Sequence, residues 1–509
     1  MNDPAMPSAG FGAESRESFE QLLGWLEGGL ATEMTHAELE DELEDRGREL
    51  LRRMLQDHLS LRTATEQRLE DVADADGVVH AAVEAGHRRA LASIFGQVQS
   101  ERLAYRHRGH ANLYPADAAL NLPIERHSHG LRRLAAIESS RGSFEQATAA
   151  ITRATGQRIG KRQVEALAGR AAVDVADFYA LTKPPEAGEG DVLVLSADGK
   201  GIVMRPDSLR PATAKAAATA STKLATRLSK GEKRNRKRLA EVGAVYDLHP
   251  LPRKASDILG GNNHGNNHGN DPPQTPPSRP KAVNKWVTAS VVDDAAEVIA
   301  DVFDEAERRD PDHRRTWIAL VDGNNHQIDR IHTEAEARGI TLTVVIDLVH
   351  VLEYLWAAAW CFFSEADPDA EAWVRRRALA ILEGNALAVA TGIRRRATAA
   401  RLPKPKRAKA DQCAKYLTNK AEHLDYPTAL ASGWPIATGI IEGACRYLVA
   451  DRMDITGARW SVNGAEAVLR LRAVRANGDF DAYWRYHLQR ERQRIHQPRY
   501  ANDVIQLAA

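Results

Sequence analysis

Acidic side chains stand at the ends of short apolar runs at three places in the chain. Asp198 follows residues 192–197 and precedes a glycine, Asp322 follows residues 316–321 and also precedes a glycine, and Asp347 closes residues 341–346. Such runs are typical of buried strands, and the Asp-Gly pairs mark turns after them. One Asp-Gly pair alone is most often only a turn. Several strands that each place a carboxylate at one end predict a shared acidic site.

A fourth carboxylate, Glu442, lies on a helix that we expect to begin at Gly439. Two aspartates on adjacent strands and a glutamate on a later helix can hold two divalent cations, which activate a water or a 3′-hydroxyl in phosphodiester chemistry. Oxygen ligands suit Mg²⁺ or Mn²⁺ rather than zinc. The chain has no GxxxxGK[ST] loop, so an ATP-driven mechanism has no support.

The elements around these aspartates follow a fixed order. Strands are expected at 192–198, 242–251, 286–292, 316–322 and 341–347, with helices at 293–309 and 326–338 between the last three. The order β, β, β, α, β, α, β is that of the ribonuclease-H-like fold. Because the first and fourth strands of that fold lie side by side, we expect Asp198 and Asp322 to be neighbours.

Length and composition restrict the class of protein. A chain of 509 residues allows about three domains, and its formal net charge of zero gives no global sign of a nucleic-acid partner. The three cysteines, Cys361, Cys413 and Cys445, form no CxxC pair, which argues against a disulfide framework or a cysteine-based zinc site. We expect a cytoplasmic, nucleoid-associated bacterial protein, because the chain shows neither a signal peptide nor a membrane-spanning run.

The region before the first strand reads as mainly helical, with a strand-like patch around Phe95 to Arg106. Residues 39–61 have helical periodicity, and Ser143 begins a capping-box pattern. Two helices joined at residues 156–160 within 143–180 fit either a helix-turn-helix or a plain helical hairpin. In the helix-turn-helix interpretation the second helix exposes DNA-binding side chains, namely Lys161, Arg162, Gln163 and Arg170.

Two basic stretches and one polar loop interrupt the core. Residues 205–238 carry eleven Lys and Arg against two acids, and residues 394–409 carry eight with no acid. Such runs are usually solvated surface, but next to an acidic site they could hold a phosphate backbone. Residues 260–280, with Asn-Asn-His-Gly repeats and prolines, predict a disordered loop rather than a histidine metal site.

These features together predict five regions. They are an N-terminal helical region at 1–90, a DNA-binding region at 91–185, the first part of a ribonuclease-H-like α/β core at 186–350, an α-helical insertion at 351–435, and the completion of the core with basic C-terminal helices at 436–509.

Several motifs in this order resemble the ISKra-type insertion-sequence transposases, relatives of the Mutator-like DDE transposases. They are SADGKG at 196–201, VDGN at 321–324, IDLVHVLEYLW at 346–356, GIIEGACRYL at 439–448 and TGARWS at 456–461. The upstream pieces YPADAALNLP and HGLRRLAA resemble the same family. The resemblance covers roughly residues 90–490.

The resemblance implies roles for the acidic residues. Asp198 would be the first catalytic aspartate and Glu442 the catalytic glutamate. Topology favours Asp322 as the second aspartate, and Asp347 to His350 then resembles a [CD]xxH motif in which the histidine orients DNA or the scissile phosphate. The competing assignment makes Asp347 the second metal ligand and Asp322 a turn residue. His350 could instead be a buried, hydrogen-bonded histidine.

Three further residues near Glu442 are candidates for DNA contact. Arg446 lies one helical turn after Glu442 and is expected either to form a surface ion pair with it or to contact phosphate. Arg459 and Trp460 could clamp and stack on DNA, but a tryptophan just after a glycine turn is as often a core anchor.

The sequence therefore predicts a DDE transposase of a bacterial insertion sequence that cleaves and joins DNA with two Mg²⁺ or Mn²⁺ ions. Its expected partners are the terminal repeats of its element and target DNA as double strands, with no membrane. A homo-oligomer on DNA is expected, because two element ends must be brought together. The alternatives are a ribonuclease-H-like nuclease without strand transfer and a transposase-derived DNA-binding protein that has lost catalysis.

Overall fold

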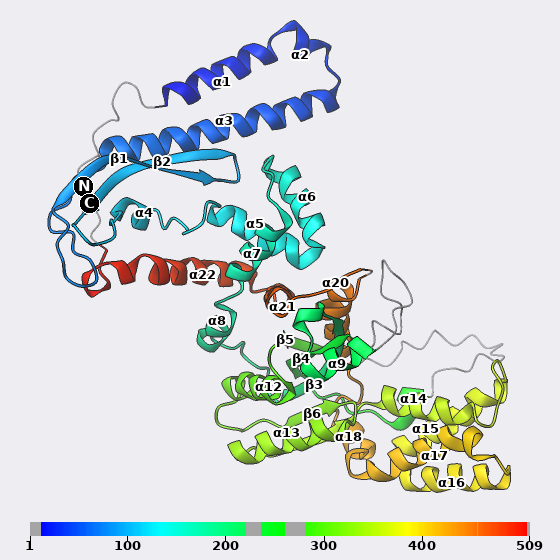
Figure 1. Cartoon of the computed structure of the whole chain (residues 1–509). Coiled ribbons are helices and arrows are strands. Elements are labelled where there is room, and N and C mark those ends of the chain that lie inside the picture. Colours follow the sequence, from blue (N-terminus) through cyan, green and yellow to red (C-terminus); the bar gives the residue numbers. More distant parts are fainter. Residues whose placement is uncertain (1–11, 220–235, 260–279, 456, 506–509) are drawn as a thin grey trace. The chain divides into compact units, whose positions relative to one another are not determined.

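The computed structural model describes residues 12–219, 236–259, 280–455 and 457–505 (Figure 1). The chain forms two compact units, Met1–Leu181 with Gly478–Ala509, and Thr182–Asn477. Part of the basic stretch at 205–238 and nearly all of the predicted loop at 260–280 lie outside the described residues. Among the residues described, no helix combines the length and apolar character that a membrane crossing requires.

The first unit begins with helices and a two-stranded ribbon. Helices α1 (Ala13–Leu26) and α2 (Gly29–Glu33) precede α3 (His36–Thr65), which contains the predicted helix at 39–61 and starts at a capping box on Thr35. Strands β1 (Ala82–Ala92) and β2 (Gln97–Arg106) pair antiparallel, and α4 (Pro115–Ala119) follows. The sequence did not predict β1, because its charged residues 87–89 hide any apolar alternation.

Three helices form a small bundle around one apolar cluster. They are α5 (His129–Arg141), α6 (Phe144–Thr155) and α7 (Lys161–Ala171), and their shared core includes Leu131, Ile151 and Val164. The predicted capping box at Ser143 is confirmed, and Gly156 ends α6 with a φ of 67°. The two predicted helices and the turn between them are thus present.

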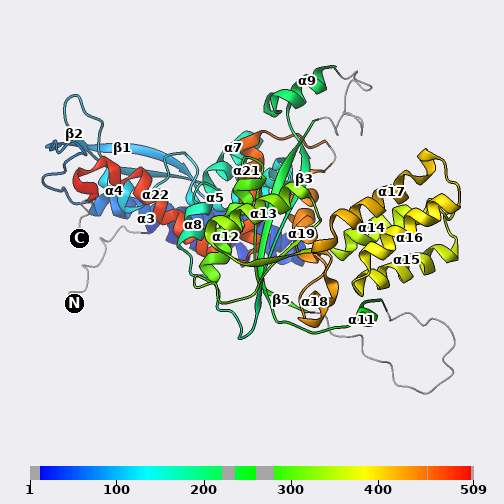
Figure 2. The same ribbon diagram turned by 90° about the horizontal axis from the view of Figure 1, so that it is seen from below.

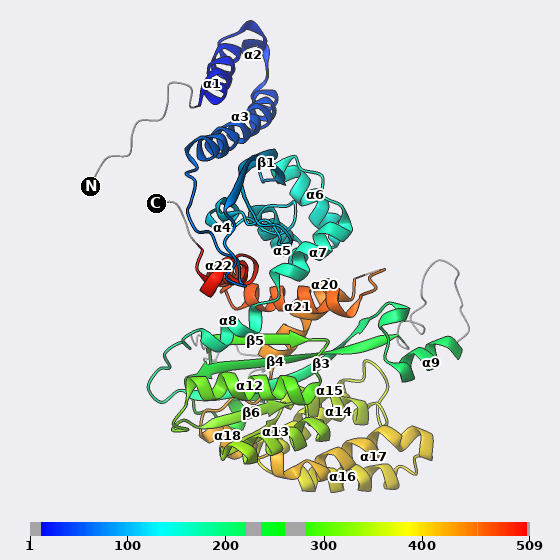
Figure 3. The same cartoon turned by 60° about the vertical axis from the view of Figure 1, so that its left-hand side comes forward.

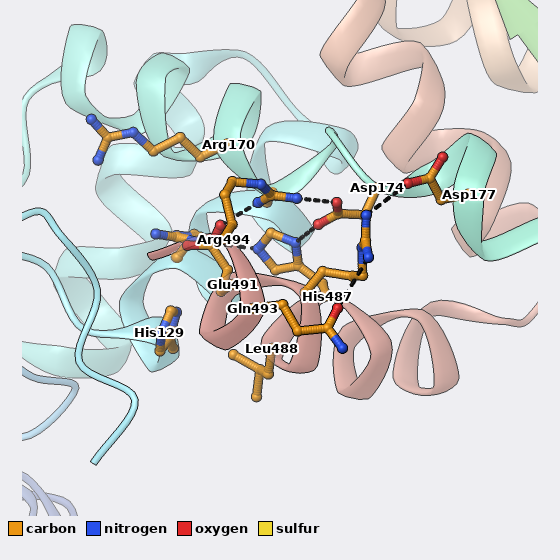
Figure 4. Close-up of polar contacts among 12 residues, drawn as sticks. His129, Arg170, Asp174, Asp177, His487, Leu488, Glu491, Gln493 and Arg494 are labelled. Carbon is orange, nitrogen blue, oxygen red and sulfur yellow. Dashed lines mark hydrogen bonds and ion pairs between the residues drawn. The ribbon is translucent and has the colours of Figure 1, made fainter. Parts of the chain in front are cut away.

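The last helix belongs to this unit, which corrects the predicted region at 436–509. Helix α22 (Phe480–Ile495) presents the fully buried ring of His487, whose Nδ1 lies 2.7 Å from Oδ2 of Asp174, just before α8 (Val175–Leu181). Asp174 also pairs with Arg494 (Figure 4). Buried Arg132 of α5 bonds Glu491, so charged contacts fix α22 to the N-terminal helices.

The second unit is a mixed α/β domain built on a five-stranded sheet in the order β5-β4-β3-β6-β7. The strands are β3 (Val192–Val203), β4 (Lys237–Leu248), β5 (Ala282–Ser290), β6 (Trp317–Val321) and β7 (Leu342–Ile346). The first three pair antiparallel, whereas β6 and β7 run parallel to β3. The predicted element order is confirmed, and so is the pairing of the first and fourth strands.

The predicted boundaries of the first two strands were wrong. Strand β4 spans Lys237–Leu248 rather than 242–251. Strand β3 does not end at Asp198 but continues to Val203, because β4 pairs with it over its whole length. Short helical segments follow it, η1 (Pro206–Ser208) and α9 (Pro211–Thr219), and α11 (Ala255–Leu259) follows β4.

Helices cover the sheet and extend from it. Helix α12 (Ala295–Arg309) packs on β3 and β4, where Gly243 leaves room for Val302, and α13 (Asn325–Arg338) packs against α12 and β6 (Figure 3). The predicted helical insertion is present as α14 (Leu348–Ala359), α15 (Pro368–Leu382), α16 (Ala386–Ala399), α17 (Lys404–Asn419), η2 (Ala421–His423) and α18 (Tyr426–Ala431). Figure 2 shows α14 to α17 gathered beside the sheet.

The chain then returns to the sheet. Helix α19 (Gly439–Ala444) continues as a π-helical segment, η3 (Cys445–Ala450), and α20 (Asp451–Met453). Helix α21 (Val462–Ala476) packs on β5, where buried Glu466 accepts hydrogen bonds from Ser290 and Val291. Short η4 (Gln497–Arg499) and η5 (Ala501–Asp503) end the described chain in the first unit.

Candidate active site

The three predicted aspartates fall in one row across three neighbouring parallel strands. Leu195 of β3 pairs with Ala319 of β6, and the same offset continued by three residues places Asp198 beside Asp322. Val321 pairs with Ile346 of β7, so the next position places Asp322 beside Asp347. Because neighbouring strands lie about 4.8 Å apart, side chains in one row can approach a common ligand.

Asp198 lies on β3, the central strand of the sheet. Its side chain is partly exposed, and its Oδ2 lies 3.2 Å from Sγ of Cys445, which donates a weak hydrogen bond. Oδ1 accepts a bond from the Gly199 amide at 2.6 Å. Cys445 follows Glu442 by one helical turn, so this contact also holds the glutamate helix against β3.

Asp322 begins the turn after β6. Its Oδ1 accepts a hydrogen bond from the Asn324 amide at 2.8 Å, and its backbone carbonyl accepts one from the Tyr416 hydroxyl at 3.0 Å. The residue borders a pocket of about 540 Å³ that is also lined by His350, Tyr354 and Lys420. Asp322 is therefore open to a cleft on its outer side.

Asp347 is completely buried, and both oxygens of its carboxylate accept hydrogen bonds from the protein. Its Oδ1 caps α14 by accepting a bond from the Val349 amide at 2.7 Å. Its Oδ2 accepts bonds from both the amide and the hydroxyl of Thr438, the former at 3.0 Å. The carboxylate thus joins the start of α14 to the residue before α19, which positions the glutamate helix.

His350 and Glu442 complete the group. One ligand atom each from Asp347, His350 and Glu442 lie within 4.8 Å of one another. The side chain of His350 is half-buried, so His350 is not the fully buried core histidine of the alternative interpretation. Its Nδ1 lies 3.3 Å from a carboxylate oxygen of Glu353. His350 also lines the pocket that Asp322 borders, so it belongs both to that pocket and to the group with Asp347 and Glu442.

The electrostatic environment of Glu442 shows that negative charge is concentrated here. Partial burial raises the pKa of Glu442, and the nearby carboxylates of Asp347, Glu353 and Asp198 raise it further, while His350 lowers it. A divalent cation would relieve this repulsion. The donor set, carboxylate oxygens with one imidazole, fits Mg²⁺ or Mn²⁺.

The helix that carries Glu442 is irregular where it passes β3. It changes from α to π geometry at Cys445, and π-segments occur frequently at functional sites. Arg446 on this segment is 81% exposed and lies 3.8 Å from Asp451, so it forms no pair with Glu442. Arg459 is also exposed.

Trp460 is placed differently from a DNA-stacking residue. It is 4% exposed, its Nε1 donates to the Met453 carbonyl at 3.0 Å, and the guanidinium of Arg452 lies 4.6 Å from its ring centroid. Its backbone pairs with that of Val203 and Arg205. The ring has no face open to a base, so the DNA contact expected of Trp460 is corrected to a core anchor that closes the end of β3.

The predicted DNA-binding side chains of α7 are all exposed, but three of the four already form an ion pair or a hydrogen bond within the protein. Lys161 pairs with Glu145 at 3.1 Å, and Arg170 pairs with Glu125 at 2.6 Å. Gln163 accepts a hydrogen bond from the Gly160 amide at 2.9 Å and so serves the start of its own helix. Arg162 is exposed on the same first turn.

Sequence reasoning missed two residues next to Asp198. Glu241 of β4 lies opposite Gly199, and burial followed by the charge of Asp198 raises its pKa. Cys445 had been considered only as a possible disulfide or zinc residue. The strand alternation of β4 and the one-turn spacing of Glu442 and Cys445 were the available signals.

A scan against protein-family models and a search of curated proteins found no match to this chain.

Proposed function

We propose that the chain is a DNA transposase of the DDE class from a bacterial insertion sequence. The observation that carries the proposal is the row of Asp198, Asp322 and Asp347 on three adjacent strands, with Glu442 held against the same row by α19. Carboxylates that raise one another's pKa, as Asp347 and Asp198 raise that of Glu442, are costly unless they bind cations, so this arrangement supports metal-dependent chemistry.

The sheet supports a ribonuclease-H-like core. Its order is 3-2-1-4-5 when the strands are counted along the chain, with only the second strand antiparallel to the others, and helices connect the third to the fourth and the fourth to the fifth. This is the arrangement expected of that fold from the element order. It brings Asp198, within the first strand, next to the ends of the fourth and fifth strands.

Asp198, Asp322 and Glu442 would hold two Mg²⁺ or Mn²⁺ ions. When bound, such ions activate a water or 3′-hydroxyl and stabilise the leaving oxygen of a phosphodiester. Asp347 already uses both oxygens for the protein, so we assign it to positioning α14 and α19. His350, beside the pocket, is suited to orient a DNA phosphate.

The α5–α7 bundle is the candidate element for recognising the ends of the transposon. Its second predicted helix exposes Arg162, Lys161 and Arg170, side chains able to contact phosphate or base edges. Two element ends must be joined in one reaction, which supports a homo-oligomer on DNA.

The test is Mg²⁺-dependent cleavage and joining of DNA that carries the regions flanking the coding sequence. Wild type is compared with Asp198→Asn, Asp322→Asn and Glu442→Gln, and with Glu371→Gln, an exposed acid of α15, as the matched control. We expect the first three variants to bind DNA without cutting it and the control to remain active.

Other outcomes separate the alternatives. Cutting without joining would identify a nuclease, and binding without metal-dependent cutting by wild type would identify a DNA-binding protein. Normal DNA cleavage by Asp322→Asn would show that Asp322 is not the second metal-binding aspartate.

A further inference from the structure

A second group of metal-binding side chains lies in the first unit, at the base of the β1–β2 ribbon. The ligand atoms of Asp74, His80 and His110 lie within 4.8 Å of one another. The ring of His107 lies 5.3 Å from that of His110 and 6.0 Å from that of His80, centroid to centroid. The group has no part in the proposed DNA chemistry.

Two tight turns bring these side chains together. In the first, the His80 amide bonds the Val72 carbonyl at 2.8 Å, and Oδ1 of Asp74 accepts bonds from two amides of the turn, each at 3.0 Å. The second turn follows β2, where Tyr105 and Leu113 pair through both backbone bonds. It contains His107 and His110, with two residues between them.

The hydrogen bonds of His80 leave one nitrogen facing a carboxylate. The residue is 1% exposed, and its Nδ1 lies 3.1 Å from the Tyr105 carbonyl, which can only accept, so Nδ1 carries a hydrogen. Its Nε2 lies 3.0 Å from Oδ2 of Asp74. A neutral ring would present a lone pair to this anion. Either a proton on Nε2, which makes the ring an imidazolium, or a metal ion between the two atoms removes the repulsion.

His107 is oriented in the same way. Its Nδ1 lies 3.1 Å from the Val79 carbonyl, which leaves Nε2 as the acceptor nitrogen. A backbone carbonyl that receives the second ring N–H is the arrangement that orients metal-ligating histidines. Oδ2 of Asp74 also lies 2.8 Å from Nδ1 of His110, so one carboxylate oxygen faces two imidazoles.

We propose that Asp74, His80 and His110 form a structural Zn²⁺ site that joins the two turns, with the ring of His107 beside it. Ligand atoms bound to one tetrahedral zinc at about 2.0–2.2 Å lie roughly 3.3 Å apart, and the rings of two such histidines have centroids roughly 5 Å apart. The distances of 3.0 and 2.8 Å from Asp74, and the separation of 6.0 Å between the rings of His80 and His110, are close to these values.

A metal ion at this site would stabilise the C-terminal segment as well as the β1–β2 ribbon. Asp74 forms a backbone bridge with Tyr500, whose ring packs in one cluster with Val72 and Tyr105. Zinc binding would therefore stabilise the C-terminal segment against the same turns, and its free energy would add to that of folding.

The test is titration of the full chain with Zn²⁺, and with Co²⁺ as a spectroscopic substitute, in competition with a chromophoric chelator. A His350→Ala background removes the other Asp-His-Glu group. His110→Gln is compared with His87→Gln, since both side chains are about one third exposed and each pairs with a carboxylate. His110 is used because the buried ring of His80 could be needed for folding.

We expect one Zn²⁺ per chain in the background, tetrahedral Co²⁺ absorption, and a rise in Tm on zinc addition. His110→Gln should lower the affinity by more than the roughly 10- to 100-fold that loss of an outer hydrogen-bond partner of a ligand costs. His87→Gln should leave it unchanged. Equal affinities of these two variants, or no stoichiometric zinc in the background, would overturn the proposal.

Discussion

Asp347 and Asp322 are neighbours in the row of aspartates, yet their contacts predict very different losses of folding stability when each is replaced by asparagine. In Asp347→Asn the amide can still cap α14 through its oxygen, but its nitrogen then faces the Thr438 amide, a second donor. A buried N–H left without an acceptor costs about 1–3 kcal/mol. We therefore expect Asp347→Asn to destabilise the second unit by about 2 kcal/mol.

Larger and smaller changes bracket this value. Asp347→Ala removes the helix cap as well, which adds about 1 kcal/mol and leaves two more groups unpaired, so a loss of about 4 kcal/mol is expected. Asp322→Asn keeps an oxygen for the exposed Asn324 turn and should change stability by less than about 0.5 kcal/mol. Asp367→Asn is the matched control, because Asp367 caps α15 through the same two-residue bond in an exposed setting.

Urea denaturation followed by tryptophan fluorescence and circular dichroism measures these differences. Midpoints are compared, because a chain with two compact units need not unfold in one step. DNA cleavage is measured on the same preparations at a temperature where every variant is folded. If Asp347→Asn unfolds at the wild-type midpoint but does not cut DNA, Asp347 is a metal ligand and its assigned positioning role is wrong.

Three further predictions concern charge. The pKa of Glu442 is raised above its ordinary value of 4.5, so its contribution to stability is present below pH 4.5 and is lost as the pH rises through the raised pKa. Without metal, Glu442→Gln should therefore have a higher Tm than wild type at neutral pH. Added Mg²⁺ should raise the Tm of wild type more than that of this variant. Arg132→Ala breaks a buried ion-pair network and should cost about 3–5 kcal/mol in the first unit by hydrogen exchange, whereas Arg133→Ala, whose pair is exposed, should cost under about 1 kcal/mol. Arg162→Ala should weaken DNA binding uniformly across sequences and reduce the slope of log K against log salt by about 0.9, as measured by fluorescence anisotropy.

Local patterns predicted many elements of the fold. The order of the strands and helices from 192 to 347 followed from apolar periodicity, and the start of α6 followed from the capping box at Ser143. The positions of Asp198, Asp322, Asp347 and Glu442 as candidates followed from what precedes and follows them. These are properties of a few consecutive residues, which is why one sequence was sufficient.

Other features depend on contacts between distant residues. Trp460 has the same local sequence whether it faces DNA or the interior, and only its bridge to Met204 and the Arg452 contact decide for the interior. Strand β3 continues beyond Asp198 because β4 supplies hydrogen bonds there. Likewise, α22 lies with the N-terminal unit because His487 and Glu491 find partners there that lie more than three hundred residues earlier.

By itself, then, the sequence determined which residues could do chemistry and on which elements they stand, because apolar periodicity, helix caps and helical turns are set locally. The tertiary structure decided which of them share a site. The parallel pairing of β3, β6 and β7 fixes the register that aligns three aspartates, and burial against Thr438 separates Asp347 from the more open Asp322. Register and burial arise only when segments far apart in the chain pack together.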